Sequence, residues 1–418
     1  MARERRTDVL VVGAGPVGLL SALVLANRGM AVELVDQAWR PATHGFALAL
    51  HPRSLEILDD LGLAEGLIAR GRRIDSVGFY EGAERQAGLD LGSLDAKFPF
   101  VLALSQRELE GVLQERLRRR RVKIRWNHRL SGLEDQGGEV VATVDKLDRV
   151  SGGYPVASRT EVVAASSTVR CEFAIGADGH HSLVRRKLGL DFEQVGGAAL
   201  FGVFEFAADL AAPAEMRVIL DREGSGGLWP LPSGRCRFSF ELGDSPAPAP
   251  VGSARSVTAI GQQAYPEIAI DRLSGLVQAR APWFDPRFSE VLWSVAVGFE
   301  RRLTRSLGRG RVWLAGDAAH CMFPVGMQSM NLGLEEAYQL ASAIADRMRG
   351  VSAETIFDSY QRERQDELRL VLGLDELAAR AEAGAWVREQ RDRIRECLPA
   401  CGEELVQLLA RLGLERRA

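Results

Sequence analysis

The chain opens with a short apolar run that leads into three regularly spaced glycines, and this pattern restricts the fold more than any other part of the sequence. Residues 10–12 have the apolar character of a buried strand, and Gly13-x-Gly15-x-x-Gly18 follows them directly. A packed helix should come next, ending at Gly29. A second apolar run then ends on Asp36. This order of strand, glycine turn, helix and strand predicts a βαβ unit that binds a dinucleotide.

The spacing between the glycines and the acid supports this interpretation. Asp36 lies 36 − 13 = 23 residues after Gly13, near the roughly 20 expected for an acid that binds a ribose hydroxyl. The helix N-terminus would hold the pyrophosphate through its free N–H groups and its dipole. A secretory signal peptide also has a basic start and an apolar run, but it needs neither the glycine turn nor the acid. The residues predicted to form the cradle are Gly13, Ala14, Gly15, Pro16, Val17, Gly18 and Asp36.

Composition narrows the remaining classes of function. The 418 residues carry a net charge of −3, which gives no basic footprint for nucleic acid. Beyond residue 30 no apolar run is long enough to span a membrane. The five cysteines are odd in number and form no Cys-x-x-Cys, which predicts reduced thiols in a cytoplasmic protein. Cys397 and Cys401 should share one face of a helix and be buried. The histidines lack ligand spacing, so we predict no metal site.

The middle of the chain has a different pattern. Residues 235–242 alternate between apolar and polar side chains, which predicts an antiparallel strand with one buried face and one solvated face. After residue 311 a short apolar strand again ends on an acid, Asp317, and the rest of the chain reads as largely helical. We therefore predict an α/β protein in which a Rossmann-like nucleotide domain is assembled from distant segments. A mostly antiparallel sheet would be inserted into it.

Two further motifs show a resemblance to a known family. Gly176-Ala-Asp178-Gly and Gly316-Asp317-Ala-Ala-His320 resemble the DG and GD motifs of the flavin monooxygenases of the para-hydroxybenzoate hydroxylase type. Together with the glycine cradle and the helix that begins near Gln106, they occur in the family's order as far as about residue 372. The resemblance implies an FAD-binding domain (1–75, 102–190 and 301–372), a substrate domain (76–101 and 191–300) and a C-terminal helical segment (373–418).

The resemblance also implies roles for residues outside the cradle. Asp317 ends a strand, where its carboxylate can accept a hydrogen bond from a ribityl hydroxyl, and the N–H groups of residues 329–331 can stabilise reduced flavin. Arg185 is expected to assist NAD(P)H. Simpler roles also fit: Asp178 can form a turn, Asp317 can cap a helix, and Gln106 can lie beside a helix cap. The further residues expected to bind the cofactor are Gln106, Asp178, Gly316, Asp317, Pro324, Gly326, Met330 and Asn331.

Several positions depart from the family pattern. A proline of the motif after His320 is replaced by Phe323, and a glycine of that motif by Ser329. The helix that follows carries a pair of glutamates, 335–336, where aspartate is common, and Gln37 stands where an arginine often follows the acid. The changes at Phe323 and Ser329 are expected to alter how closely the flavin approaches the backbone, or how its ring sits. His44 lies in a stretch expected to pass the flavin edge, where an incidental loop position fits it better than a catalytic role.

The implied reaction is that of an FAD-dependent monooxygenase. NAD(P)H reduces the flavin, O₂ forms a C4a-hydroperoxide, and oxygen passes to a small aromatic or polyketide-like substrate by hydroxylation or epoxidation. No side chain is needed as a nucleophile, and no catalytic residue is assigned. A prenyl-type reductase, a flavin halogenase and a non-catalytic FAD-binding protein are the alternatives, although the halogenase motif W-x-W-x-I-P is absent. We leave open whether the protein is a monomer or a homodimer. The expected pocket walls are Pro324, Trp229, Phe238 and Phe240, the last three fitting a sheet core equally well.

Overall fold

A computed structural model describes the chain apart from residues 1–2, 41–44, 153–157, 209–213, 244–256, 261–262, 285–289, 352, 354 and 418. Its nucleotide-type half is built on a six-stranded sheet in the order β21-β22-β13-β2-β3-β9. All pairs are parallel except β21 with β22. The strands are β2 (Val9–Val12), β3 (Val32–Val35), β9 (Ile124–Arg125), β13 (Phe173–Gly176), β21 (Gly308–Arg309) and β22 (Val312–Leu314).

The parallel arrangement places the three sequence motifs at one edge of this sheet. β2 leads into Gly13, β13 leads into Asp178, and β22 leads into Gly316. Since β13 lies between β2 and β22 and runs parallel to both, the carboxyl ends of all three strands lie together. Segments separated by some three hundred residues therefore meet at one site.

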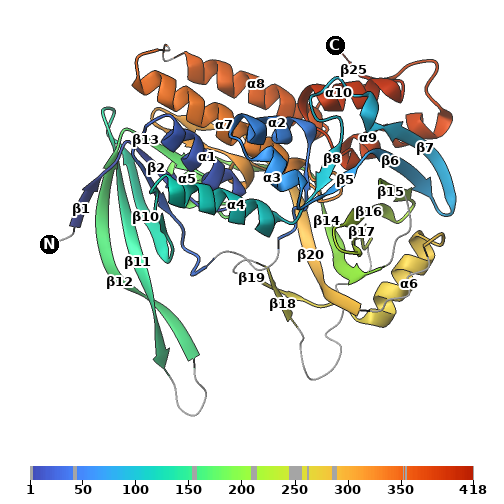
Figure 1. Cartoon of the computed structure of the whole chain (residues 1–418), viewed down its shortest axis with the longest axis horizontal. Coiled ribbons are helices and arrows are strands. Elements are labelled where there is room, and N and C mark those ends of the chain that lie inside the picture. The colour runs from blue at the N-terminus through green and yellow to red at the C-terminus, as the bar shows by residue number, and fades with distance from the viewer. Residues whose placement is uncertain are drawn as a thin grey trace.

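Helices cover this sheet, and α1 (Pro16–Asn27) lies between α4 (Gln106–Arg119) and α7 (Gln328–Met348) (Figure 1). α1 begins with proline at its first position, where no backbone donor is required, and eight of its twelve residues are buried. The other helices of this half are α2 (Pro52–Asp60), α3 (Ala64–Ile68), α5 (Leu183–Lys187) and α8 (Ile356–Val371).

A second, eight-stranded sheet has the order β23-β20-β14-β17-β16-β15-β6-β7 and is antiparallel except where β15 meets β6. Helix α6 (Ile270–Arg280) packs on one face of it, over a core of phenylalanines. The strands are β6 (Ser76–Glu81), β7 (Glu84–Asp90), β14 (Phe192–Ala207), β15 (Glu215–Asp221), β16 (Gly224–Leu231), β17 (Arg235–Glu241), β20 (Glu290–Thr304) and β23 (His320–Cys321).

The expectation that residues 235–242 form a half-solvated strand is wrong in one respect. β17 is a central strand, and its polar residues Arg237 and Ser239 are as buried as its phenylalanines. The alternation is real, but both faces of the sheet are covered. α6 covers the apolar face, and the nucleotide half covers the polar face.

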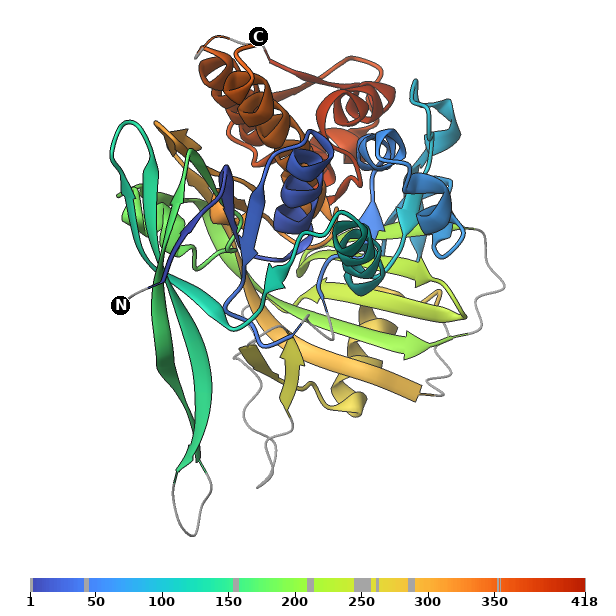
Figure 2. The ribbon, with the colours of Figure 1, turned by 60° about the vertical axis from the view of Figure 1, so that its left-hand side comes forward.

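Smaller sheets complete the fold. A four-stranded sheet, β1-β12-β11-β10, extends away from the body as a long ribbon (Figure 2). The basic N-terminal stretch forms β1 and pairs in parallel with β12. The strands of these sheets are β1 (Arg3–Arg6), β10 (His128–Asp135), β11 (Val140–Gly152), β12 (Ser158–Cys171), β4 (Ala49–Leu50), β5 (Arg72–Ile74), β8 (Val101–Ala103), β18 (Val257–Ile260) and β19 (Gln263–Pro266).

The C-terminal segment contains α9 (Ala385–Cys397) and α10 (Gly402–Arg411), and also the paired strands β24 (Leu377–Ala379) and β25 (Leu414–Arg416). The expectation that Cys397 and Cys401 share one face of a helix is wrong. Pro399 interrupts the helical run, so Cys397 ends α9 and Cys401 caps α10. Both thiols are buried. Within the described part of the chain, no helix combines the length and apolar character needed to cross a bilayer.

Because the Phe238 ring lies in the core beneath α6, its loss should weaken the fold and leave cofactor binding intact. Phe238 contacts Phe206, Phe240 and Phe284 and is fully buried. We expect Phe238→Ala to lower the free energy of unfolding by about 3–5 kcal/mol. Urea unfolding measures this loss, and an FAD titration at low temperature should give the wild-type dissociation constant. A large change in FAD affinity with unaltered stability would contradict this placement.

Candidate flavin site

The glycine cradle has tight contacts at two of its glycines and open space at the third. A methyl group on Gly13 would lie 2.1 Å from the carbonyl oxygen of Ala177, and Gly13 has a φ of +105°. A methyl group on Gly18 would lie 1.9 Å from the carbonyl oxygen of Gly13. By contrast, nothing lies within 4 Å of the position that a methyl group on Gly15 would take. The turn is therefore closed where it packs and open where a pyrophosphate would approach, which fits FAD.

Asp36 faces the cradle from the end of β3. Its Oδ2 accepts a hydrogen bond from the Ala14 N–H at 2.6 Å, and its Oδ1 accepts one from the Ala38 N–H at 2.6 Å. Burial raises the pKa of Asp36, although both backbone bonds oppose the change. The two bonds fix the orientation of the carboxylate at the position expected for a ribose contact.

The GD motif, Gly316-Asp317-Ala-Ala-His320, forms a tight turn that the Glu336 carboxylate stabilises. Gly316 has a φ of +65°, and its N–H donates to Glu336 Oε2 at 2.7 Å. The ring of His320 lies beside the same carboxylate, with Nε2 3.0 Å from Oε1. Burial opposes protonation of His320, but the charge and hydrogen bond of Glu336, together with the charges of Asp317 and Glu367, outweigh it and raise the pKa of His320. The Glu336 side chain thus supports the turn from a position about two helical turns inside α7.

Asp317 is exposed, and its carboxylate accepts one hydrogen bond among the described residues. The hydroxyl of Ser329 donates to Asp317 Oδ1 at 2.7 Å. Ser329 is the position where the family usually has glycine, so its hydroxyl orients an acid that the sequence assigns to the ribityl chain. The other carboxylate oxygen, Oδ2, has no hydrogen bond among the described residues.

The glycine cradle and the GD motif are in direct contact. Methyl groups on Gly316 and Gly333 would lie 2.8 Å and 2.7 Å from the Val17 Cγ2 atom. α1 and α7 therefore approach closely, side by side, with their N-termini at the same edge of the sheet. The free N–H groups of both first turns lie there, as a ligand with a pyrophosphate and a reducible ring requires.

Two other predicted residues, Asp178 and Gln106, make mainly structural contacts. The Asp178 carboxylate caps α5, accepting bonds from the Ser182 hydroxyl and from the N–H groups of Leu183 and Val184. Gln106 donates to Glu110 at 2.8 Å, and burial raises the pKa of Glu110 to about 7. Their side chains therefore fit the simpler roles given above.

Arg185, expected to assist NAD(P)H, is buried. Its guanidinium donates to the carbonyls of Ala318 and His180 at 2.8 Å and lies over the Phe192 ring. It therefore ties the DG segment to the GD segment. His44 lies outside the described residues.

The side-chain amide of Asn331 makes four hydrogen bonds within the protein. Its Oδ1 accepts from the His51 N–H at 2.8 Å and the Ser54 hydroxyl at 2.7 Å, and its Nδ2 donates to the carbonyls of Ala49 and Met327. The amide therefore joins α7 to α2 and β4. Of this residue, only the backbone N–H is left to face a flavin.

Residues 323–331, the flavin loop, lie on the polar face of the eight-stranded sheet. The Trp229 indole N–H donates to the Val325 carbonyl at 3.2 Å, and the Phe201 and Phe323 rings lie 5.5 Å apart. Pro324 is buried within this loop, as are Gly326 and Met327, while Met330 is partly buried. Trp229 therefore lies on the side expected for a substrate.

Phe238 and Phe240 do not lie on that side. The strand register pairs Trp229 with Arg237, so neighbouring residues of β17 point the other way, toward α6. The prediction that these two rings line the pocket is corrected for this reason: they form the sheet core.

The polar residues on the opposite face of β17, which does meet the nucleotide half, were not predicted from the sequence. Arg237 donates to Glu205 Oε2 at 2.8 Å and to the Phe46 carbonyl at 2.8 Å, and the Trp293 indole donates to the same Glu205 oxygen at 3.2 Å. Ser239 is buried and its hydroxyl has no hydrogen bond among the described residues. The alternation within residues 235–242 placed these polar residues on one face of the strand. A charged residue in a strand normally indicates a solvent-exposed face, so the burial of this face was not predicted.

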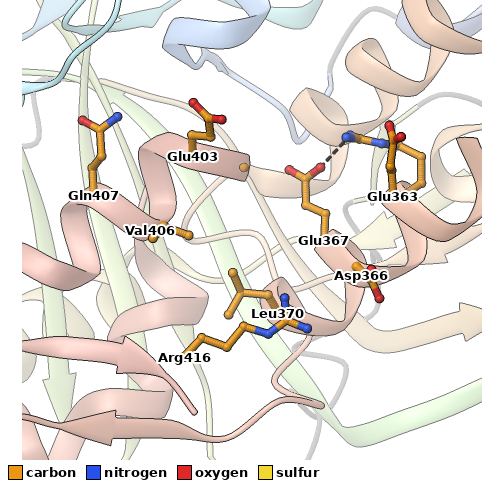
Figure 3. A pocket seen from close by; sticks show the side chains of 10 residues that line it. Glu363, Asp366, Glu367, Leu370, Glu403, Val406, Gln407 and Arg416 are labelled. Carbon is orange, nitrogen blue, oxygen red and sulfur yellow. Dashed lines mark ion pairs between the residues drawn. The ribbon is translucent and has the colours of Figure 1, made fainter. Parts of the chain in front are cut away.

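A separate cleft of about 490 Å³ lies between α8 and α10 (Figure 3). Acidic side chains line it, and Arg364 pairs with Glu367 at 2.6 Å beside it. It shares no residue with the cradle or the flavin loop.

Residues 6–373 match the family described as "FAD binding domain". Because this match covers most of the chain, the protein belongs to that family, FAD is its cofactor, and the resemblance seen in the motifs is confirmed.

Among curated proteins, the 6-methylpretetramide 4-monooxygenase of Streptomyces rimosus is 34% identical over 364 residues, covering 85% of this chain and 59% of the relative. The rifampicin monooxygenase of Rhodococcus hoagii is 29% identical over 387 residues, covering 90% and 71%. The crystal structure of p-nitrophenol 4-monooxygenase from Pseudomonas putida DLL-E4 aligns with a TM-score of 0.73 at 24% identity, covering 88% and 86%, which bears on the fold alone. The chain thus spans about three fifths of the length of the first of these relatives.

Proposed function

We propose that the protein is an NAD(P)H-dependent monooxygenase that hydroxylates or epoxidises a small aromatic or polyketide-like compound. The observation that carries this proposal is the position of the flavin loop on the polar face of the sheet, where Trp229 binds Val325. A flavin held by this loop would lie beside indole rings and a buried ion pair. Two of the relatives are named as monooxygenases of 6-methylpretetramide and of rifampicin, which agrees with such a substrate.

The chemistry that FAD supplies is two-electron transfer from NAD(P)H followed by activation of O₂. The cradle and Asp317 would hold the cofactor, and the first turn of α7 would stabilise negative charge on its ring. Apolar side chains around the flavin loop exclude water from the reacting atoms. Arg237 and Ser239 are buried polar residues on the face of β17 that the nucleotide half covers, and they suit a substrate that bears hydroxyl or carbonyl oxygens.

The test is an anaerobic stopped-flow screen of aromatic and polyketide compounds. We expect a true substrate to accelerate bleaching of the flavin by NAD(P)H, and the product formed in air to gain the mass of one oxygen atom. Saturation of a double bond without oxygen uptake would instead identify a reductase, and dependence on chloride a halogenase. Absence of turnover with every compound, in a protein that binds FAD, would favour a non-catalytic flavoprotein. We further propose that it acts in the cytoplasm, which its five free thiols support, and that it is a monomer or homodimer.

A further inference from the structure

The chain between α9 and α10 is in contact with the flavin loop. A methyl group on Gly326 would lie 2.6 Å from the Leu398 carbonyl oxygen, so the two backbones are in contact. The side-chain amide of Gln328 donates to the carbonyls of Arg395 and Ala400 at 3.0 Å and 3.3 Å. Gln328 is buried, and these carbonyls are its amide's partners. The loop is therefore hydrogen-bonded to a segment some seventy residues further along the chain.

A buried pair, His51 and Cys401, adds a second connection. His51 Nε2 lies 3.0 Å from the Gly326 carbonyl oxygen, which can only accept, so Nε2 carries the proton. Burial lowers the pKa of His51 to about 3, so the ring is neutral and Nδ1 is an acceptor. The Cys401 thiol lies 3.4 Å from Nδ1 and 3.8 Å from the Gln328 carbonyl, and burial raises its pKa. The thiol therefore donates to a ring that itself donates to the loop.

The loop between these connections has a backbone conformation that needs support. Met327 precedes α7 with a φ of +55°, in the left-handed region that a side chain such as methionine rarely adopts. Such a conformation persists where its surroundings hold it on several sides. The sheet holds the loop at Val325, His51 holds it at Gly326, and the C-terminal segment holds it at Gln328.

We propose that residues 385–401 are a positioning element that presents the flavin loop to FAD. This segment lies beyond residue 373, where the match to the family ends, so the family does not assign it a role. The contacts of Gln328 and Cys401 fix the backbone that leads into the first turn of α7. The inference rests on the binding of FAD at that turn, which the proposed function requires.

Three full-length variants test the contribution of the thiol. Cys401→Ala removes the donor, Cys401→Ser keeps a donor, and Cys397→Ala removes a buried thiol of the same segment that makes no bond to His51 or to the loop. Hydrogen exchange of peptides covering 323–331 is measured in FAD-free protein, followed by an FAD titration and the reduction potential of the bound flavin. The exchange measurement needs no bound cofactor, so it tests the positioning role even if the proposed function fails.

We expect both alanine variants to lose similar thermal stability. Only Cys401→Ala should speed exchange in the loop, raise the FAD dissociation constant about ten-fold and shift the potential, because a buried acceptor loses its partner. Cys401→Ser should restore these values toward wild type. Equal loop exchange, affinity and potential in Cys401→Ala and Cys397→Ala would overturn the proposal.

Gln328→Ala provides an independent measurement on the same connection. Its matched control is Gln339→Ala on the same helix, since among the described residues the Gln339 amide bonds only to Glu335 within α7. We expect Gln328→Ala to weaken FAD binding about ten-fold or more and the control to leave it unchanged. An FAD affinity that both variants share with wild type, together with unaltered exchange in residues 323–331, would show that the C-terminal segment does not position the loop.

Discussion

Replacement of Gly15 by alanine should leave the protein folded and raise its FAD dissociation constant about 100-fold. The backbone at Gly15 has φ −73° and ψ −178°, which any residue adopts, and the added methyl group would meet no atom within 4 Å. The free space around it is where a pyrophosphate would approach the N–H groups of α1. Displacing the phosphates would weaken charge-assisted hydrogen bonds, each worth about 1.5–3 kcal/mol.

Equilibrium titration with FAD, monitored by flavin fluorescence, measures this effect, and circular dichroism confirms the fold. Gly111→Ala is the matched control, because that glycine lies in α4 and also has open space. Gly18→Ala should behave in the opposite way and unfold the protein, since its methyl group would overlap the Gly13 carbonyl. Wild-type FAD affinity in Gly15→Ala would mean that the pyrophosphate lies elsewhere.

Replacement of Asp317 by alanine should give a folded protein that is purified without flavin colour. The Asp317 side chain is exposed at the end of β22, and Ser329 is the residue that orients it, so its removal leaves no buried group unpaired. A hydrogen bond from a ribityl hydroxyl to a carboxylate contributes about 1.5–3 kcal/mol, so its loss should raise the dissociation constant about ten- to 100-fold.

The absorbance of the purified variant and an FAD titration check this prediction. Asp366→Ala removes an exposed acid on α8, beside the separate cleft, and should retain full colour. If Asp317→Ala is as yellow as wild type, the carboxylate is only a cap for the turn that follows it.

Much of the site was predictable because strand order and motif position determine it. Gly13, Asp178 and Gly316 each follow a short apolar strand, and parallel strands bring their carboxyl ends to one edge. The helices that begin at Pro16 and Gln328 follow from the same pattern. These are local features of the chain, and local features can be read from the sequence.

Contacts between distant strands could not be predicted in this way. Whether Phe238 or Arg237 faces the flavin loop depends on which face of β17 meets the nucleotide half, and alternation alone does not distinguish the faces. Asn331 resembles a cofactor ligand until its four partners are known. Likewise, the spacing of Cys401 from Cys397 gives no indication that the thiol meets His51, 350 residues away.

The account depends on one FAD molecule lying across the glycine cradle and the first turn of α7. The most direct measurement is a titration of the purified, flavin-stripped wild-type protein with FAD, monitored by visible absorbance and flavin fluorescence. The account predicts saturable binding of one FAD per chain, with the blue-light absorbance of a bound flavin. A protein that shows no such absorbance and takes up no FAD at any concentration would contradict it.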